Sequence, residues 1–224
     1  MKIIARIRTD FKEKFGIPRQ SGIAEELVGR IVFEKPYRNP DALRGIEGYS
    51  HLWLIWQFSE SVCDEWSPTV RPPRLGGNRR LGVFATRSPF RPNPIGLSSV
   101  RLLGIEHTEK EGDVLLVGGA DLLDGTPIYD IKPYLAYTDS HADAVCGFAD
   151  DVRDYRVGVC FPPELLSLVE ESKRASLLTV LENDPRPSYR ADGEHEYGMS
   201  FADYEVFFKV ENGTLTVTRL IRHS

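Results

Sequence analysis

Short runs in which apolar and polar residues alternate dominate the chain up to about residue 135. This period of two is the pattern of half-buried β-strands. The first run, residues 2–8, places Ile3, Ala5 and Ile7 between polar neighbours. Gly, Pro and Asp separate it from further β-rich runs at 28–33, 51–58, 81–86, 95–103, 113–118 and 126–131. The pattern predicts an all-β sheet or a small barrel with few helices.

The periodicity changes after Pro162-Pro163. Apolar residues then recur at helical spacing until Asp184-Pro185, which predicts one helix carrying Leu165, Leu168, Val169, Leu177, Val180 and Leu181. Two alternating runs flank Asn212-Gly213, a strong signal for a β-hairpin. A polar, aperiodic stretch at 138–152 separates the two parts. We therefore expect a mainly β protein, with a β-barrel over 1–140 and a small α+β domain over 152–224.

Several classes of protein are disfavoured by what the sequence lacks. It has no uninterrupted apolar run long enough to span a bilayer, and its first residues become charged too early for a signal peptide. We expect a soluble cytoplasmic protein without a membrane partner. The five histidines are scattered, and Cys63, Cys146 and Cys160 form no C-x-x-C pair, so no metal site is predicted. Phosphate-loop, dinucleotide, zinc-protease and serine-hydrolase motifs are missing.

Charge is unevenly distributed along the chain. The net charge is −5, yet residues 66–105 contain seven arginines, no lysine and no acidic residue. Such a positive island attracts ligands that carry phosphates. Four of these arginines share the loop 71–80, which joins two prolines to a Gly-Gly pair, and we expect them to contact RNA: Arg71, Arg74, Arg79 and Arg80. The alternative is that acidic residues elsewhere in the fold pair with them.

Three other segments could carry chemistry. Residues 14–20 bring an arginine and a glutamine onto a predicted loop. In 84–97, three prolines remove backbone donors and leave carbonyl groups unpaired within the segment, and such carbonyls could recognise an adenine edge. In 121–134, an Asp-Gly turn leads into a strand whose Asp130, Lys132 and Tyr134 share one face. An exposed loop or an ordinary edge strand would explain the first and last of these equally simply.

Taken together, six ordered blocks resemble the TrmO (TsaA-like) family of tRNA methyltransferases. The blocks are PRQ at 18–20, YSHLW at 49–53, PTVRPPRLGGN at 68–78, GVFATRSPFRPNPIG at 82–96, DLLDGTPIYDIKPY at 121–134 and DPRPSYR at 184–190. The resemblance implies a TsaA-like β-barrel that uses S-adenosyl-L-methionine to methylate N6 of threonylcarbamoyladenosine at tRNA position 37. It also implies a homodimer with the cofactor site near the subunit interface.

The family's functional positions can be transferred to this chain. The resemblance implies that the cofactor-binding residues are Pro18, Arg19, Gln20, Ser59, Glu60, Arg87, Leu97, Asp124, Gly125, Thr126 and Pro127. Attack by N6 requires loss of its proton, and the candidate acceptors are Asp130 and Tyr134, with Asp124 as a third. We expect residues 152–224 to select the RNA without taking part in the chemistry, with contacts from Arg186, Tyr189 and Arg190.

Two other functions remain open from the sequence. A non-catalytic RNA-binding module would explain the arginine island but not the 121–134 block, and it would not bind the cofactor. A small-molecule methyltransferase would explain the cofactor segments but not the loop 71–80, and it would act without tRNA.

Overall fold

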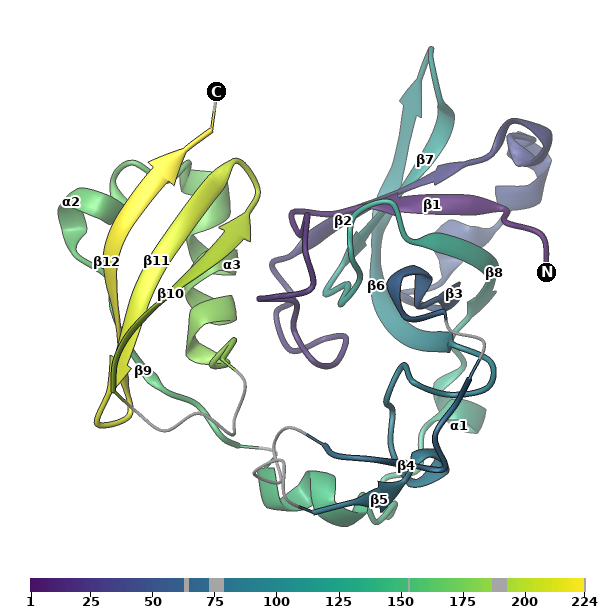
Figure 1. Ribbon diagram of the computed structural model, residues 1–224. Helices are drawn as coiled ribbons and strands as arrows, with labels where there is room; N and C mark the ends of the chain where they lie inside the picture. The colour runs from purple at the N-terminus through teal and green to yellow at the C-terminus, as the bar shows by residue number, and fades with distance from the viewer. Residues whose placement is uncertain (63–64, 73–78, 153, 187–192, 224) are drawn as a thin grey trace.

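The computed structural model describes the chain except for residues 63–64, 73–78, 153, 187–192 and 224. Its first part is a closed barrel of six antiparallel strands in the order β1-β2-β7-β6-β3-β8 (Figure 1). The ring closes because β1 pairs with both β2 and β8. The strands are β1 (Ala5–Arg8), β2 (Val28–Phe33), β3 (His51–Gln57), β6 (Ile95–Thr108), β7 (Gly112–Gly118) and β8 (Pro127–Pro133).

Alternation of side chains along these strands produces the barrel core. In β3, Leu52, Leu54 and Trp56 point inward and are buried, whereas the intervening side chains face outward. They pack against inward-facing residues of the other strands, such as Ile7 and Ile128. The predicted mainly β fold is therefore confirmed, and six of the seven predicted strands match strands of the barrel to within a few residues.

The seventh predicted strand, 81–86, is wrong. Only β5 (Leu81–Gly82) is extended, and it pairs with the equally short β4 (Thr69–Val70). The chain then turns through a short 3-10 helix at Val83–Ala85, which Thr86 closes by donating hydrogen bonds from its amide and hydroxyl to the Val83 carbonyl. The two-stranded β4–β5 sheet flanks the sequence 71–80, of which residues 73–78 lie outside the described residues, and we call 69–82 the arm.

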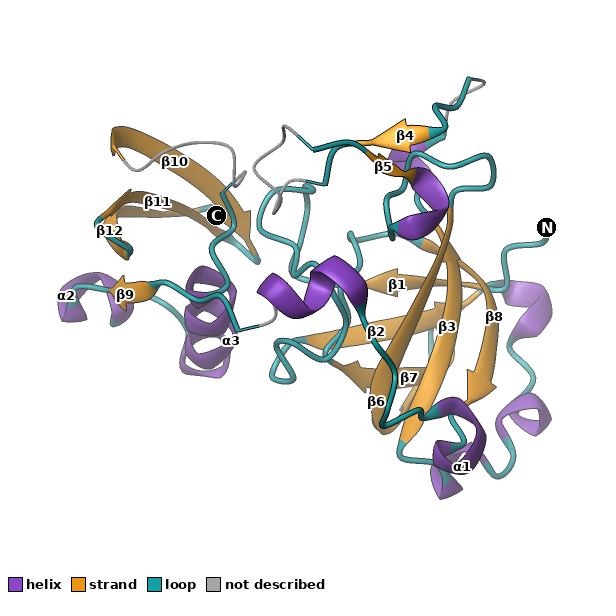
Figure 2. Ribbon diagram, turned by 90° about the horizontal axis from the view of Figure 1, so that it is seen from below, coloured by secondary structure: helices purple, strands orange, loops and turns teal. Residues whose placement is uncertain are grey.

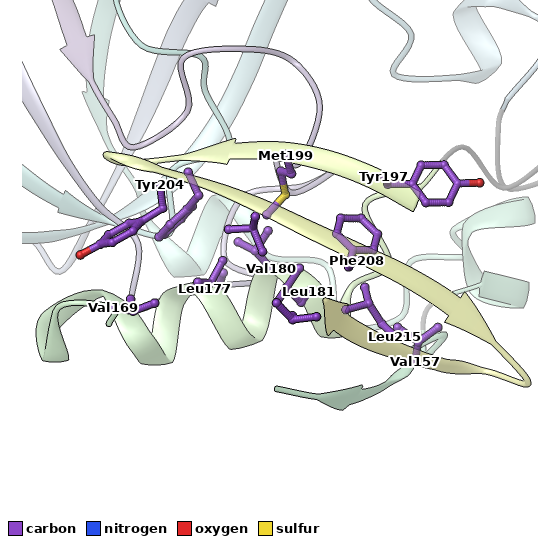
Figure 3. Packing of buried hydrophobic residues seen from close by; sticks show 14 of the residues in the cluster. Val157, Val169, Leu177, Val180, Leu181, Tyr197, Met199, Tyr204, Phe208 and Leu215 are labelled. Carbon is purple, nitrogen blue, oxygen red and sulfur yellow. The ribbon is translucent and has the colours of Figure 1, made fainter. Parts of the chain in front are cut away.

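The second part is a four-stranded sheet, in the order β10-β11-β12-β9, that packs on a helix (Figure 2). Its elements are β9 (Gly158–Cys160), α2 (Pro163–Leu166), α3 (Glu171–Glu182), β10 (Gly193–Phe201), β11 (Tyr204–Glu211) and β12 (Thr214–Arg222). A further short helix, α1 (Ala136–Asp139), follows the barrel. Figure 3 shows Leu177, Val180 and Leu181 of α3 pointing toward the sheet side chains Met199 and Phe208.

Two predictions for this part need correction, and one is confirmed. The single predicted helix is interrupted between Leu166 and Glu171, because Glu170 is extended and its amide donates to the Tyr204 hydroxyl at 3.0 Å. Strands β9 and β10 were not predicted. The hairpin is confirmed, with Asn212 and Gly213 both at positive φ (50° and 72°) between β11 and β12.

The segment between β1 and β2 connects the two parts. Its residues Phe11, Ala24 and Leu27 are buried in the same cluster as α3 and the C-terminal sheet, not in the barrel core. Phe11 meets Phe201 edge-on, with ring centroids 5.7 Å apart. We call the contact of residues 9–27 with α3 and the C-terminal sheet the seam. Within the described residues, no helix is both long enough and apolar enough to cross a membrane.

Candidate functional site

The expected cofactor segments gather at one end of the barrel. Because β3 runs antiparallel to both β6 and β8, the end of β3 lies beside the beginnings of those strands, where Gln57 pairs with Ile95 and Trp56 with Ile128. Residues 59–60 follow β3, Leu97 lies near the start of β6, and 124–127 lead into β8. The loop 14–22 then reaches this end from the seam.

Two side-chain contacts tie the loop 14–22 to the other segments. The Lys14 ammonium donates to the Glu60 carbonyl at 2.9 Å and lies 3.5 Å from the Glu60 carboxylate. Arg87 donates to the Gln20 side-chain oxygen at 2.5 Å. Arg19 points differently, because its guanidinium donates to the Arg186 carbonyl across the seam at 3.0 Å. The structure thus brings together the segments of Gln20, Glu60 and Arg87 within one chain.

A series of buried, hydrogen-bonded polar side chains lies beneath the loop 14–22. The Trp56 indole donates to the Ser98 hydroxyl at 3.0 Å, and that hydroxyl donates to the Asp121 carboxylate at 2.6 Å. Ser98 is 1% exposed. Burial raises the pKa of Asp121 above its ordinary value, and the hydrogen bond from Ser98, backbone amides including that of Ser21, and the charge of Arg87 offset this only in part. Asp121 is therefore a partly buried acid in contact with the expected cofactor loop.

The turn 124–127 is held mainly by backbone hydrogen bonds. The amide of Thr9 donates to the Asp124 carboxylate at 3.0 Å, and the Gly125 amide donates to the Ile7 carbonyl at 2.8 Å. Thr126, which is 2% exposed, closes the turn by donating to the Leu123 carbonyl. Asp124 itself stays exposed, so its carboxylate fixes the turn and also faces solvent.

The two principal candidate proton acceptors lie far apart. Asp130 pairs with Ile55, which pairs with Leu97 on its other side, so Asp130 and Leu97 are two strand spacings apart on the outer surface, roughly 10 Å. Its carboxylate is 2.8 Å from the Lys132 ammonium. Tyr134 follows the other end of β8, where its ring lies against Trp53 and His51. The structure therefore does not bring Tyr134 to the cofactor segments of its own chain.

The expectation of unpaired carbonyls in 84–97 needs correction. Arg91 donates from its side chain to the carbonyls of Thr86 and Ser88, at 3.0 and 3.2 Å, and from its amide to Pro89. The Pro94 carbonyl accepts from the Phe58 amide. Arg91 thus replaces donors that the prolines remove, and the loop is held in one shape. Apolar side chains remain exposed around it, among them Phe84, Phe90 and Leu97.

The expected RNA contacts have different outcomes. Arg71, Arg79 and Arg80 are exposed on the arm, whereas Arg74, Tyr189 and Arg190 lie outside the described residues. The expectation for Arg186 is wrong, because its side chain is only 6% exposed and its guanidinium contacts both oxygens of the buried Asp184 at 2.8 and 2.9 Å. No cluster of three or more metal-ligating side chains occurs among the residues that the structure describes.

Comparison with known proteins places the chain in one family. Residues 6–140 match the N-terminal domain of tRNA-methyltransferase O, and residues 155–223 match the TrmO C-terminal domain. The tRNA (adenine(37)-N6)-methyltransferase of Escherichia coli K12 is 43% identical over 97% of this chain and 95% of its own length. A Pseudomonas aeruginosa relative, "Putative S-adenosylmethionine-dependent methyltransferase RcsF", is 41% identical over 91% of this chain and 89% of its own.

Solved structures agree with these sequence matches. The crystal structure of TrmO from Pseudomonas aeruginosa covers 98% of this chain and 97% of its own, with a TM-score of 0.77 and 33% identity. The chain belongs to the TrmO family, as the six sequence blocks indicated.

Sequence reasoning missed the residues that join these segments. Trp56, Ser98 and Asp121 lie on three distant parts of the chain, and only the barrel register places them in contact. One signal was available, since Ser98 is a polar residue at an inward position of β6. Such a residue needs a buried partner.

Proposed function

We propose that this protein is an S-adenosyl-L-methionine-dependent tRNA methyltransferase that methylates N6 of threonylcarbamoyladenosine at position 37. The observation that carries the proposal is the meeting of the segments of Gln20, Glu60, Arg87 and Asp124 at one end of a barrel that has the TrmO architecture. Relatives of this chain are named tRNA (adenine(37)-N6)-methyltransferases, and Arg71, Arg79 and Arg80 are exposed on the arm.

The side chains at this end suit the cofactor. Arg87 offers a guanidinium group for its carboxylate, Glu60 offers a negative charge toward the sulfonium, and the exposed Leu97 offers an apolar surface for its adenosine. Arg19, whose guanidinium donates to the Arg186 carbonyl, would contribute through its backbone. Pro18, Ser59, Gly125, Thr126 and Pro127 would contribute backbone groups and shape. The cofactor, when bound, supplies the methyl group, and the chain's own task is to hold N6 in line at near-attack distance.

We assign the role of proton acceptor to Asp130. Conjugation with a carbonyl makes N6 weakly nucleophilic, so loss of its proton accompanies attack. Asp130 lies on the surface that leads to Leu97, whereas Tyr134 lies at the opposite end of the strand. Lys132 holds the Asp130 carboxylate in place through the contact at 2.8 Å. Asp130→Asn should lower kcat without changing cofactor affinity, and Tyr134→Phe should leave kcat nearly unchanged.

Further parts of the proposal concern partners. The arm would hold the tRNA backbone through Arg71, Arg79 and Arg80, and bases of the anticodon loop are accessible without opening a duplex. We propose that the protein acts as a homodimer in the cytoplasm, where its tRNA substrate is found. The exposed Phe84 and Phe90 would provide apolar surface at the dimer interface.

The deciding experiment combines purified protein, S-adenosylmethionine and tRNA that carries threonylcarbamoyladenosine without the N6-methyl group. Nucleoside mass spectrometry should find the methylated nucleoside, and an Arg87→Ala, Gln20→Ala double variant should lose most of the activity. Cofactor binding with no methylation of any acceptor would favour another function. Methylation of a free nucleoside as efficiently as of tRNA would support a small-molecule methyltransferase.

A further inference from the structure

We propose that Asp121 is a positioning residue of the cofactor site, acting through Arg87 and the backbone of the loop 14–22. This inference rests on the proposed function. Asp121 is not among the cofactor-binding residues assigned above. It deepens that function by assigning a residue beneath the site that need not touch the cofactor.

The first ground is the way in which the loop is fastened to the barrel beside Asp121. The Gly22 amide donates to the Gly119 carbonyl at 2.9 Å. Both glycines have positive φ, and a side-chain carbon at Gly119 would lie 3.1 Å from the Gly22 Cα. The two backbones are therefore in close contact two residues before Asp121, and the backbone of Ser21 in the loop lowers the pKa of the Asp121 carboxyl.

The second ground is the orientation of the carboxylate. Trp56 has only a donor to offer, so Ser98 accepts from Trp56 and must donate its own proton to Asp121. This fixed donor holds one carboxylate oxygen. Gly96 makes the arrangement possible, because a side chain there would overlap the Trp56 indole.

The third ground is the charge that faces Asp121. Arg87 is the charged side chain that acts on the Asp121 carboxylate, and Arg87 also donates to Gln20. A negative Asp121 therefore attracts the Arg87 guanidinium that donates to Gln20. Loss of the charge should release the guanidinium and loosen the loop on the side where the cofactor is expected. Because burial raises the pKa of Asp121, a fall in pH through that raised pKa should produce the same loss.

The test is calorimetric titration of S-adenosylmethionine into the full chain across a range of pH. For the wild type, the Kd should be constant at high pH and rise as pH falls through the raised pKa of Asp121. Asp121→Asn keeps the shape without the charge, so its Kd should be about tenfold weaker and independent of pH over that range. Its kcat at saturating cofactor should change little.

Ser98→Ala gives a readout that a purely structural role would not give. It removes a hydrogen bond that lowers the pKa of Asp121, so the pH at which binding weakens should move upward. Asp113→Asn, which alters a half-buried partner of the exposed His107 outside this site, is the matched control and should follow the wild type.

The result that overturns the inference is an Asp121→Asn chain with wild-type affinity and pH profile. Arg87→Ala, Gln20→Ala separates this from failure of the site itself. If the double variant loses affinity while Asp121→Asn does not, only the role of Asp121 is refuted. If both bind as the wild type does, the proposed cofactor site is refuted as well.

Discussion

Gly96 illustrates how the absence of a side chain allows close packing at the end of the barrel. A methyl group at this position would overlap the Trp56 indole. Trp56 in turn packs edge-on against Phe58, with ring centroids 4.3 Å apart, and is held by Ser98. The indole thus has little room to move. It cannot shift to make space for a side chain added at Gly96.

We therefore expect Gly96→Ala to lower the free energy of unfolding by about 1–3 kcal/mol. Gly48→Ala is the matched control, since no atom lies within 4 Å of the added carbon, and it should stay within about 0.5 kcal/mol of wild type. Urea unfolding followed by tryptophan fluorescence measures both. Equal midpoints for the two variants would contradict this account of the packing.

At the scale of the element, the arm makes a direct prediction about tRNA binding. Each phosphate that an arginine neutralises releases counterions, so affinity should fall with salt. Replacing Arg71, Arg79 and Arg80 with alanine should make the log–log slope of affinity against salt shallower by about three. Filter binding at several salt concentrations measures the slope, and cofactor binding should be unaffected. An unchanged slope would remove the arm from the RNA interface.

Elements with a strong local pattern were predicted well, although most barrel strands pair with distant strands, and features that depend on one particular distant contact were not. The barrel strands and the hairpin at Asn212-Gly213 follow from alternation and turn residues alone. The break before α3 depends on the Tyr204 hydroxyl, 34 residues beyond Glu170, and could not be read locally. Strand β10 alternates Tyr197, Met199 and Phe201, but the polar residues before them hid the pattern.

The same distinction applies to the candidate site. The sequence blocks identified the segments expected to bind the cofactor. The register of β3, β6 and β8 then shows that these segments lie at one end of the barrel. Arg186 was misjudged because burial cannot be inferred from residue type. The separation of Tyr134 from the cofactor segments of its own chain follows from the strand register, which the sequence alone did not show. Arg186 has the composition of a phosphate ligand, yet its buried pairing with Asp184 makes it part of the protein interior.

At the scale of the whole molecule, the seam makes the two sequence domains interdependent. The loop expected to bind cofactor packs on the C-terminal sheet, where Phe15 stacks on Phe208 with an interplanar angle of 3° and Gly16 contacts Met199. Around them, Phe11, Ala24 and Leu27 are at most 4% exposed. Residues 152–224 should therefore support the cofactor site as well as select RNA.

A chain ending at residue 150 should consequently lose both stability and cofactor binding. Exposing each large apolar side chain of the seam costs about 1.5–3 kcal/mol. Thermal unfolding and calorimetry with S-adenosylmethionine measure the two effects. The control is a full chain cut by a protease in the exposed stretch 140–146, which keeps the seam and should bind normally. Wild-type affinity in the shortened chain would show that the barrel holds the loop alone.

The closed six-stranded barrel also bears on aggregation. A closed barrel presents no unpaired strand edge, so the strand edges lie in the two-residue strands of the β4–β5 pair and in the C-terminal sheet, at β9 and β10. Strand β9 has three residues, and β10 is irregular in its pairing between Gly193 and Tyr197. Short and bulged edges make poor templates for a strand from another molecule. The C-terminal sheet should thus resist aggregation by successive addition of strands from other molecules. Subunits should associate through side-chain contacts and not through a β-sheet that continues from one subunit into the next.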